Sequence, residues 1–141
     1  MRLVDANVLL YAVNIDALLH RPAREWMDDA LDGPEPVGFA WVVLLAFLRL
    51  STRPGLFPRP LDLETAAGVV ETWLAAAPAV VVHPTTRHLT ILHGLLGRLG
   101  TAGNLVNDAH LAALALEHGA EVVSFDRDFS RFPGLRWRLP G

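Results

Sequence analysis

The sequence predicts an α/β protein with three layers, in which helices cover both faces of a mostly parallel central sheet of four to five strands. Short apolar runs alternate along the chain with longer segments whose apolar residues recur at helical spacing. This alternation is typical of βαβ units, because parallel strands need long crossover connections that are usually helices. With 141 residues, we expect residues 1–141 to fold as a single domain.

Each expected strand is three or four residues long, which is too short for a helix and fits a buried strand between helices. The expected strands are Arg2–Asp5, Val37–Phe39, Val80–Val82, Glu121–Ser124 and Leu135–Arg138. One helix is expected to begin at Asn7. Further helices are expected at His20–Leu31, Ala40–Thr52, Asp62–Ala77, Thr85–Leu99 and Asn104–His118. For the last helix, Asn104 is the predicted N-cap and Gly119 the predicted stop.

Composition excludes several classes of protein. No apolar run approaches the ~20 residues that span a bilayer, and the N-terminus does not resemble a signal peptide, so we expect a cytoplasmic protein. Cysteine is absent, which excludes disulfides and thiolate zinc sites. The net charge of −3 argues against a broadly basic nucleic-acid binder, although four arginines gather within residues 127–141.

Aspartates stand at the ends of two expected strands and on one helix. Asp5 ends the first strand, and Asp126 follows the fourth, with Asp128 two residues beyond it. Asp108 lies on an otherwise apolar face of the Asn104–His118 helix. Because sites in open α/β sheets gather beyond the carboxyl ends of the strands, we expect these acids to converge there. Taken alone, Asp5 is equally well explained as a helix cap.

Acids that converge among apolar groups repel one another and raise each other's pKa values unless a cation neutralises them. Carboxylate oxygens alone favour a hard divalent ion, Mg²⁺ or Mn²⁺, over zinc. Such a site suits hydrolysis of a phosphodiester, because the metal activates water and stabilises the charge that develops at phosphorus. Receiver domains and haloacid-dehalogenase-like phosphatases also cluster aspartates at strand ends, but both use a lysine, and this chain has none.

Three motifs together resemble the PIN-domain fold and, more narrowly, the VapC-type ribonuclease toxins of bacterial toxin–antitoxin pairs. The motifs are Leu3–Ala12, Asn107–Ala115 and Ser124–Phe129, in the order and spacing of that family over the whole chain. Each motif is weak alone, and the three together are specific. The use of arginine in place of lysine and the ending Asp128–Trp137 look most like the actinobacterial branch of these toxins.

This resemblance implies a metal-dependent endoribonuclease that cuts RNA, with tRNA or rRNA as the expected substrate. Carried over by position, Asp5, Asp108 and Asp126 would be catalytic residues that hold Mg²⁺, with Mn²⁺ as the alternative, and Asp128 would be a supporting catalytic acid. The resemblance also implies a homodimer, a cognate VapB-type antitoxin as partner, and no membrane association.

Other polar residues would support the acids. By the same match, Asn7 and Ser124 would hydrogen-bond the acids or a water at the metal. We expect Arg49 to be the internal ion-pair partner of one acid, and a contact to an RNA phosphate is the alternative. The histidines show no metal-ligand spacing, and His110 is expected to point away from Asp108.

One position departs from the family pattern. The family usually has a glutamate three residues before the arginine that corresponds to Arg49. This chain has Ala46 at that position. Two hypotheses follow. The first is a Mg²⁺-dependent ribonuclease toxin, and the second is a catalytically weakened PIN-like domain that acts by binding RNA or antitoxin. Retention of three mutually repelling aspartates favours the first.

Overall fold

The computed structural model describes residues 1–100 and 103–141, apart from the side chain of Asn104. A five-stranded parallel sheet forms its centre, with the strand order β3-β2-β1-β4-β5. The strands are β1 (Arg2–Val4), β2 (Val37–Ala40), β3 (Ala79–Val82), β4 (Glu121–Val123) and β5 (Trp137–Arg138). The predicted α/β class and its parallel sheet are confirmed.

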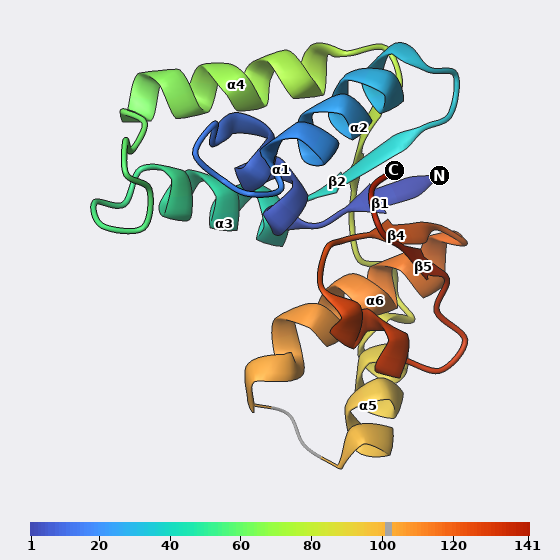
Figure 1. Ribbon diagram of the computed structural model, residues 1–141. Coiled ribbons are helices and arrows are strands. Elements are labelled where there is room, and N and C mark those ends of the chain that lie inside the picture. Colours follow the sequence, from blue (N-terminus) through green and yellow to red (C-terminus); the bar gives the residue numbers. More distant parts are fainter. Residues whose placement is uncertain (101–102) are drawn as a thin grey trace.

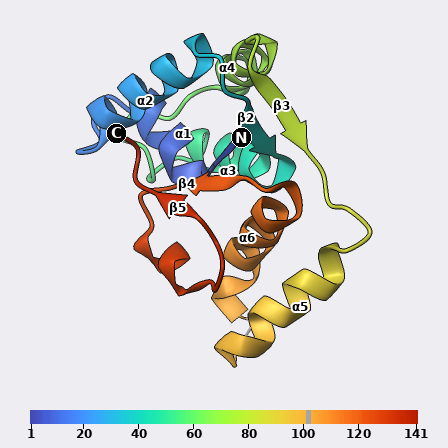
Figure 2. The same cartoon turned by 90° about the vertical axis from the view of Figure 1, so that its right-hand side faces the viewer.

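Helices cover both faces of the sheet, as Figures 1 and 2 show. One face carries α1 (Ala6–Val13), α2 (His20–Asp32), α3 (Trp41–Ser51) and α4 (Leu63–Ala75). The other face carries α5 (His88–Leu99) and α6 (Val106–His118), together with the short 3₁₀ helices η1 (Gly103–Leu105) and η2 (Arg127–Arg131). Within the described residues, no helix is long and apolar enough to cross a membrane.

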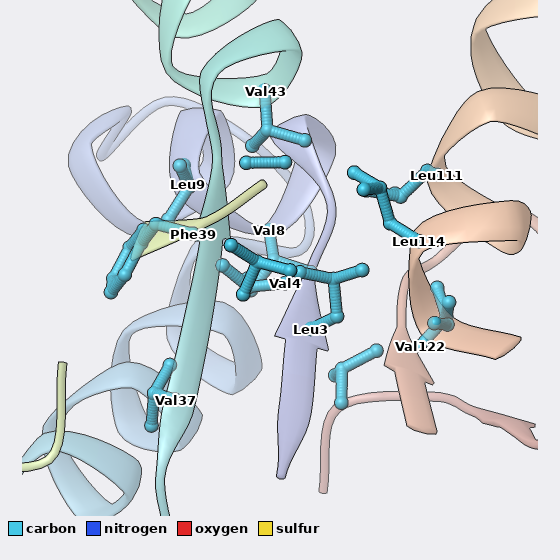
Figure 3. Close-up of a cluster of buried hydrophobic side chains, with 14 of the residues drawn as sticks. Leu3, Val4, Val8, Leu9, Val37, Phe39, Val43, Leu111, Leu114 and Val122 are labelled. Atoms are coloured by element: carbon cyan, nitrogen blue, oxygen red, sulfur yellow. The ribbon is translucent and has the colours of Figure 1, made fainter. Parts of the chain in front are cut away.

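The core lies on both faces of β1 and β2. Leu3, Val4 and Phe39 have no exposed surface, as expected for strands with helices on either side. Figure 3 shows side chains of these strands clustered with those of α1, α3 and α6. Burying each aliphatic side chain contributes about 1.5–3 kcal/mol, so this cluster fixes where the helices begin relative to the strand ends.

The C-terminal end of α6 agrees with the prediction, and its N-terminal end does not. Gly119 follows the helix with φ of +62°, the left-handed conformation that favours glycine, and the predicted stop is therefore confirmed. The predicted N-cap is wrong, because α6 begins at Val106 with Leu105 as its cap, and Asn104 lies inside η1. The 3₁₀ turn takes up the first two residues of the predicted helix, Asn104 and Leu105.

Candidate active site

The candidate site lies where the order of the strands reverses. β2 and β3 continue the sheet on one side of β1, and β4 and β5 continue it on the other. β1 and β4 pair in register, with Val4 opposite Val123, and the amide of Asp5 donates to the Val123 carbonyl at 3.0 Å. Asp5 and Ser124 therefore leave the sheet side by side. This crevice beyond the strand ends is where ligand sites of open α/β sheets form.

Asp5 joins β1 to α1 and is the N-cap of that helix. One carboxylate oxygen accepts from the amide of Ala6 at 2.7 Å, and the other accepts from the Ser124 hydroxyl at 2.7 Å. Burial raises the pKa of Asp5, and the hydrogen bonds from Ser124 and Ala6 offset only part of this effect. Asp5 is thus both a helix cap and a destabilised acid.

Ser124 connects the end of β4 to α1. Its hydroxyl is fully buried, donates to Asp5, and accepts from the Asp126 amide at 2.9 Å and from the Asn7 side-chain amide at 3.0 Å. The side-chain oxygen of Asn7, Oδ1, in turn accepts from the Phe125 backbone amide at 3.1 Å. The Asn7 side-chain amide also donates to Asp5 at 3.3 Å. The structure therefore places Asn7 and Ser124 in contact with an acid, as the family resemblance implied.

Asp126 stands at the start of η2, which the sequence did not predict. Its carboxylate accepts from the amide of Asp128 at 2.8 Å and caps this 3₁₀ helix. Asp128 is exposed, whereas Asp126 is partly buried. The helical turn holds both acids on the segment that leaves β4, next to Asp5.

Asp108 lies in the first turn of α6, opposite these acids. Its pKa is raised to about 6, first by burial and then by the negative charges of Asp5, Asp126 and Asp128. Asp5 and Asp108 line one cavity, and the Ser124 hydroxyl joins Asp5 to the amide of Asp126. The structure therefore brings Asp5, Asp108 and Asp126 to the same end of the sheet, with Asp128 exposed beside Asp126.

A cavity of about 150 Å³ opens between α3 and α6 beside Asp5 and Asp108. Ala46 lines its α3 side, at the position where the resemblance predicts a glutamate. Arg49 lies one turn further along α3 and is exposed, and within the described part of the chain it forms no ion pair. The predicted pairing of Arg49 with an acid is therefore wrong. Its place in the last turn of α3 suits a cation near solvent.

The acids fit a hard divalent ion. Among the described residues, no three Asp, Glu or His side chains are arranged to hold an ion by themselves. Mg²⁺ seldom needs such a cage, because it usually keeps several waters and binds one or two carboxylates together with substrate phosphates. Asp5 and Asp108 both line the cavity, have raised pKa values and offer only oxygen donors. These two residues could hold the ion.

No sequence pattern predicted a chain of hydrogen bonds between α5 and α6. His88 Nδ1 lies 2.7 Å from a Glu117 oxygen, and His88 Nε2 lies 2.8 Å from His110 Nδ1. The Thr85 amide donates to the other Glu117 oxygen at 3.1 Å. The partners are 22 to 32 residues apart in the sequence, so spacing within one helix carries no signal for them.

The fold and the acidic crevice define the class of protein, and comparison with known proteins agrees. The PIN domain family model matches residues 2–135, and the chain belongs to the PIN-domain family. Over 140 residues it is 60% identical to Ribonuclease VapC37 of Mycobacterium tuberculosis, with 99% of this chain and 97% of that protein covered. It is 39% identical to Ribonuclease VapC33 of the same species, with 99% and 98% covered. Within the PIN family, the chain belongs to the VapC ribonucleases, and the predicted nuclease family is confirmed.

Solved structures share the fold at low sequence identity. VapC20 of Mycobacterium tuberculosis, described as a Sarcin-Ricin loop cleaving toxin, superposes with a TM-score of 0.67 at 20% identity over 96% of this chain and 99% of that one. VapBC2 of Rickettsia felis, bound to a DNA fragment from its promoter, gives a TM-score of 0.71 at 17% identity over 98% and 97%. At these identities the likeness supports the fold alone.

Proposed function

We propose that this protein is a Mg²⁺-dependent endoribonuclease toxin of the VapC type, with Mn²⁺ as the alternative metal. One observation carries the proposal: Asp5 and Asp108 line the same cavity, and the Ser124 hydroxyl joins Asp5 to the amide of Asp126 beside it. The naming of its relatives as ribonucleases supports RNA as the substrate. The proposed class of RNA, tRNA or rRNA, rests on the family resemblance. Residues 1–141 would act as a single PIN domain in the cytoplasm.

Each acid has a distinct part in this proposal. Asp5 and Asp108 would hold the ion directly, Asp126 would be the third ligand by way of a water that the ion keeps, and Asp128 would be a supporting acid at the rim. When bound, the ion supplies Lewis acidity that activates water and neutralises charge at the phosphodiester. Ser124 keeps the Asp5 carboxylate in place through its 2.7 Å hydrogen bond.

Arginines near the site would bind the RNA backbone. Arg49 is exposed on α3, one turn from the cavity, and Arg127 and Arg131 are exposed on η2 beside Asp126. Guanidinium groups bind phosphates through two parallel hydrogen bonds, and this local positive charge offsets the repulsion between RNA and the acids. An RNA-phosphate contact is therefore the role that we propose for Arg49.

A second candidate function rests on Ala46. Because Ala46 lines the cavity where the family usually has a glutamate, the site has one carboxylate fewer. A PIN-like domain with weakened chemistry that acts by binding RNA or antitoxin is the alternative. A one-metal scheme needs fewer carboxylates than a two-metal scheme, and the acids retained here suffice for it.

Cleavage of total tRNA and rRNA by the purified protein tests the proposal. We expect discrete cuts in Mg²⁺ or Mn²⁺, none in EDTA, and none with Asp108→Asn in any metal. Asp29→Asn, at an exposed position of α2, is the matched control and should cut as the wild type does. Intact RNA in every lane, from folded and antitoxin-free protein, would support the binding-only alternative.

We also propose a homodimer and a cognate VapB-type antitoxin as partners. Trp41 and Leu45 stand one turn apart on α3 and are 47% and 57% exposed, which gives this helix an apolar outer face. One structural relative, from Klebsiella pneumoniae, is named as a toxin–antitoxin complex, and two others are named as VapBC structures. Sedimentation equilibrium of the purified protein tests the dimer, and a monomer at micromolar concentration would reject it.

A further inference from the structure

The cavity beside the acids has an apolar wall that metal binding does not explain. Its α3 side is formed by Val42, Val43 and Ala46, and Leu111 of α6 faces them. Contact with aliphatic surface is favourable because it removes apolar groups from water. A hydrated cation has no apolar groups, so it gains nothing from such contact. The wall therefore fits a part of the substrate that is itself apolar.

Size and polarity limit what this cavity accepts. Its volume is about 150 Å³, and an apolar cavity of about 150 Å³ holds a benzene-sized ring. Asn107 is the one uncharged polar side chain on the lining, and its amide can both donate and accept hydrogen bonds. A flat ring with apolar faces and a hydrogen-bonding edge meets both conditions, and a nucleobase is such a ring.

The position of the cavity specifies which part of an RNA would enter it. Asp5 and Asp108 line the same cavity, so a base within it belongs to a nucleotide next to the phosphate that these acids address. Sequence-specific RNA recognition uses unstacked bases of single strands and loops, which are free to leave the stack and enter a protein pocket. Ala46 leaves the space, since a glutamate side chain there would project into it.

We propose that the cavity between α3 and α6 is a nucleobase subsite, which receives a base that flanks the scissile phosphate. Its ring would lie against Val42, Ala46 and Leu111, with its edge toward Asn107. This inference rests on the proposed RNA hydrolysis and adds that Ala46 is a specificity-determining residue. Ala46, in place of the glutamate usual in the family, thus has a function in substrate choice.

The test couples a change in the protein to a change in the RNA. Once the cleavage site is mapped, short RNAs are prepared in which each flanking nucleotide in turn is replaced by an abasic ribonucleotide. We expect one abasic replacement to lower kcat/KM of the wild type by roughly 10-fold to 200-fold, the range for contacts in a hydrophobic pocket. Ala46→Leu, which fills the cavity, should lower kcat/KM on intact RNA by a similar factor and cause no further loss on that abasic RNA.

Controls separate the subsite from general damage. Ala75→Leu makes the same change at an exposed position of α4 and should cut every RNA as the wild type does. Because Asp5 and Asp108 line the same cavity, Mn²⁺ affinity is measured by electron paramagnetic resonance: we expect wild-type affinity in Ala46→Leu, and a loss of affinity as large as the loss of cleavage would assign the effect to the ion and overturn the subsite. If circular dichroism shows that Ala46→Leu is unfolded, Ala46→Val replaces it in the same cycle, since it adds less volume.

The possible outcomes are distinct. Equal losses for Ala46→Leu on intact and abasic RNA would overturn the subsite, because the two changes would then act independently. Unchanged cleavage of intact RNA by Ala46→Leu would also overturn the proposed subsite. The cavity would then be better explained as a binding site for a side chain of a protein partner. Absence of metal-dependent cleavage by the wild type would instead reject the proposed nuclease itself.

Discussion

At the scale of single residues, Ser124 shows how one small buried side chain sets the geometry of the site. Its hydroxyl contacts Asp5, Asn7 and the amide of Asp126 at once. Ser124→Ala removes these hydrogen bonds, but Asp5 still accepts from Ala6 and from the Asn7 side chain, so we count one buried polar group left unsatisfied, at about 1–3 kcal/mol. We expect the free energy of unfolding in urea to fall by about 1–3 kcal/mol.

Ser130→Ala is the matched control for this change, because Ser130 is exposed on the neighbouring η2 helix. Exposed substitutions of this kind usually stay within about 0.5 kcal/mol of the wild type. If the two variants lose the same stability, the hydroxyl of Ser124 does not organise the acids.

Asp108 predicts a dependence of stability on pH. Its pKa in the folded protein is about 6, above the ordinary value of 3.8, so the folded state binds the proton more tightly than the unfolded state. This group therefore costs no stability well below its unfolded pKa of 3.8, its cost grows between that pH and about 6, and the full cost is present above pH 6. In EDTA, we expect Asp108→Asn to melt at a higher temperature than the wild type at pH 7.5, and at about the same temperature at pH 4.

Thermal unfolding followed by circular dichroism at the two pH values measures this difference. Asp29→Asn serves again as the control, since this side chain is exposed on α2. A wild type that is as stable as Asp108→Asn at pH 7.5 without metal would show that the acids do not repel one another in the folded protein.

At the scale of elements, two helices begin at the site. Asp5 caps α1, and Asp108 lies in the first turn of α6. The amino-terminal ends of helices carry partial positive charge, which stabilises nearby carboxylates by roughly 0.3–1 kcal/mol each. The helix starts therefore offset part of the repulsion among the acids, and a bound cation would offset the rest.

The connection between α5 and α6 gives a prediction at this scale. Burial alone would raise the pKa of Glu117, but its hydrogen bonds to Thr85 and His88 outweigh burial and lower it. A lowered pKa in the folded state means that the ionised side chain stabilises the protein above its unfolded pKa, and that this contribution is lost as the pH falls. Glu117→Gln should therefore destabilise the protein at pH 7 by about 1 kcal/mol, and by less at pH 4.

Urea denaturation at both pH values measures the effect of Glu117→Gln, and hydrogen exchange locates it. Exchange should accelerate in α5, because His88 holds that helix to α6 through the same carboxylate. Glu71→Gln on the exposed face of α4 is the control. A loss of stability that is equal at pH 7 and pH 4 would show that the charge of Glu117 does not act.

At the scale of the whole molecule, the sequence predicted what depends on local pattern. Strands and helices followed from apolar runs and helical spacing, and the meeting of Asp5 with Asp126 followed from the shared edge of parallel strands. The His88–Glu117 contact was not predictable, because it joins side chains 29 residues apart across two helices. The pairing of Arg49 failed for a related reason, since the direction of a long exposed side chain leaves no mark in the sequence.

Metal binding should stabilise the whole fold, because the acids converge only in the folded chain. A ligand that binds the folded state alone adds about 2.7 kcal/mol at 100 times its Kd. For a chain of 141 residues, this corresponds to a rise in melting temperature of roughly 6–10 °C. We expect this rise in Mg²⁺ or Mn²⁺ for the wild type and none for Asp108→Asn.

The two variants should therefore change rank with metal: Asp108→Asn is the more stable in EDTA, and the wild type is the more stable at saturating Mg²⁺. NaCl at matched ionic strength is the control, because salt screens the repulsion among the acids without occupying a site. An equal rise in melting temperature for both proteins would show that the metal acts only by screening the charges. A rise confined to the wild type, without any cleavage of RNA, would establish the ion site and at the same time favour the binding-only alternative over the nuclease.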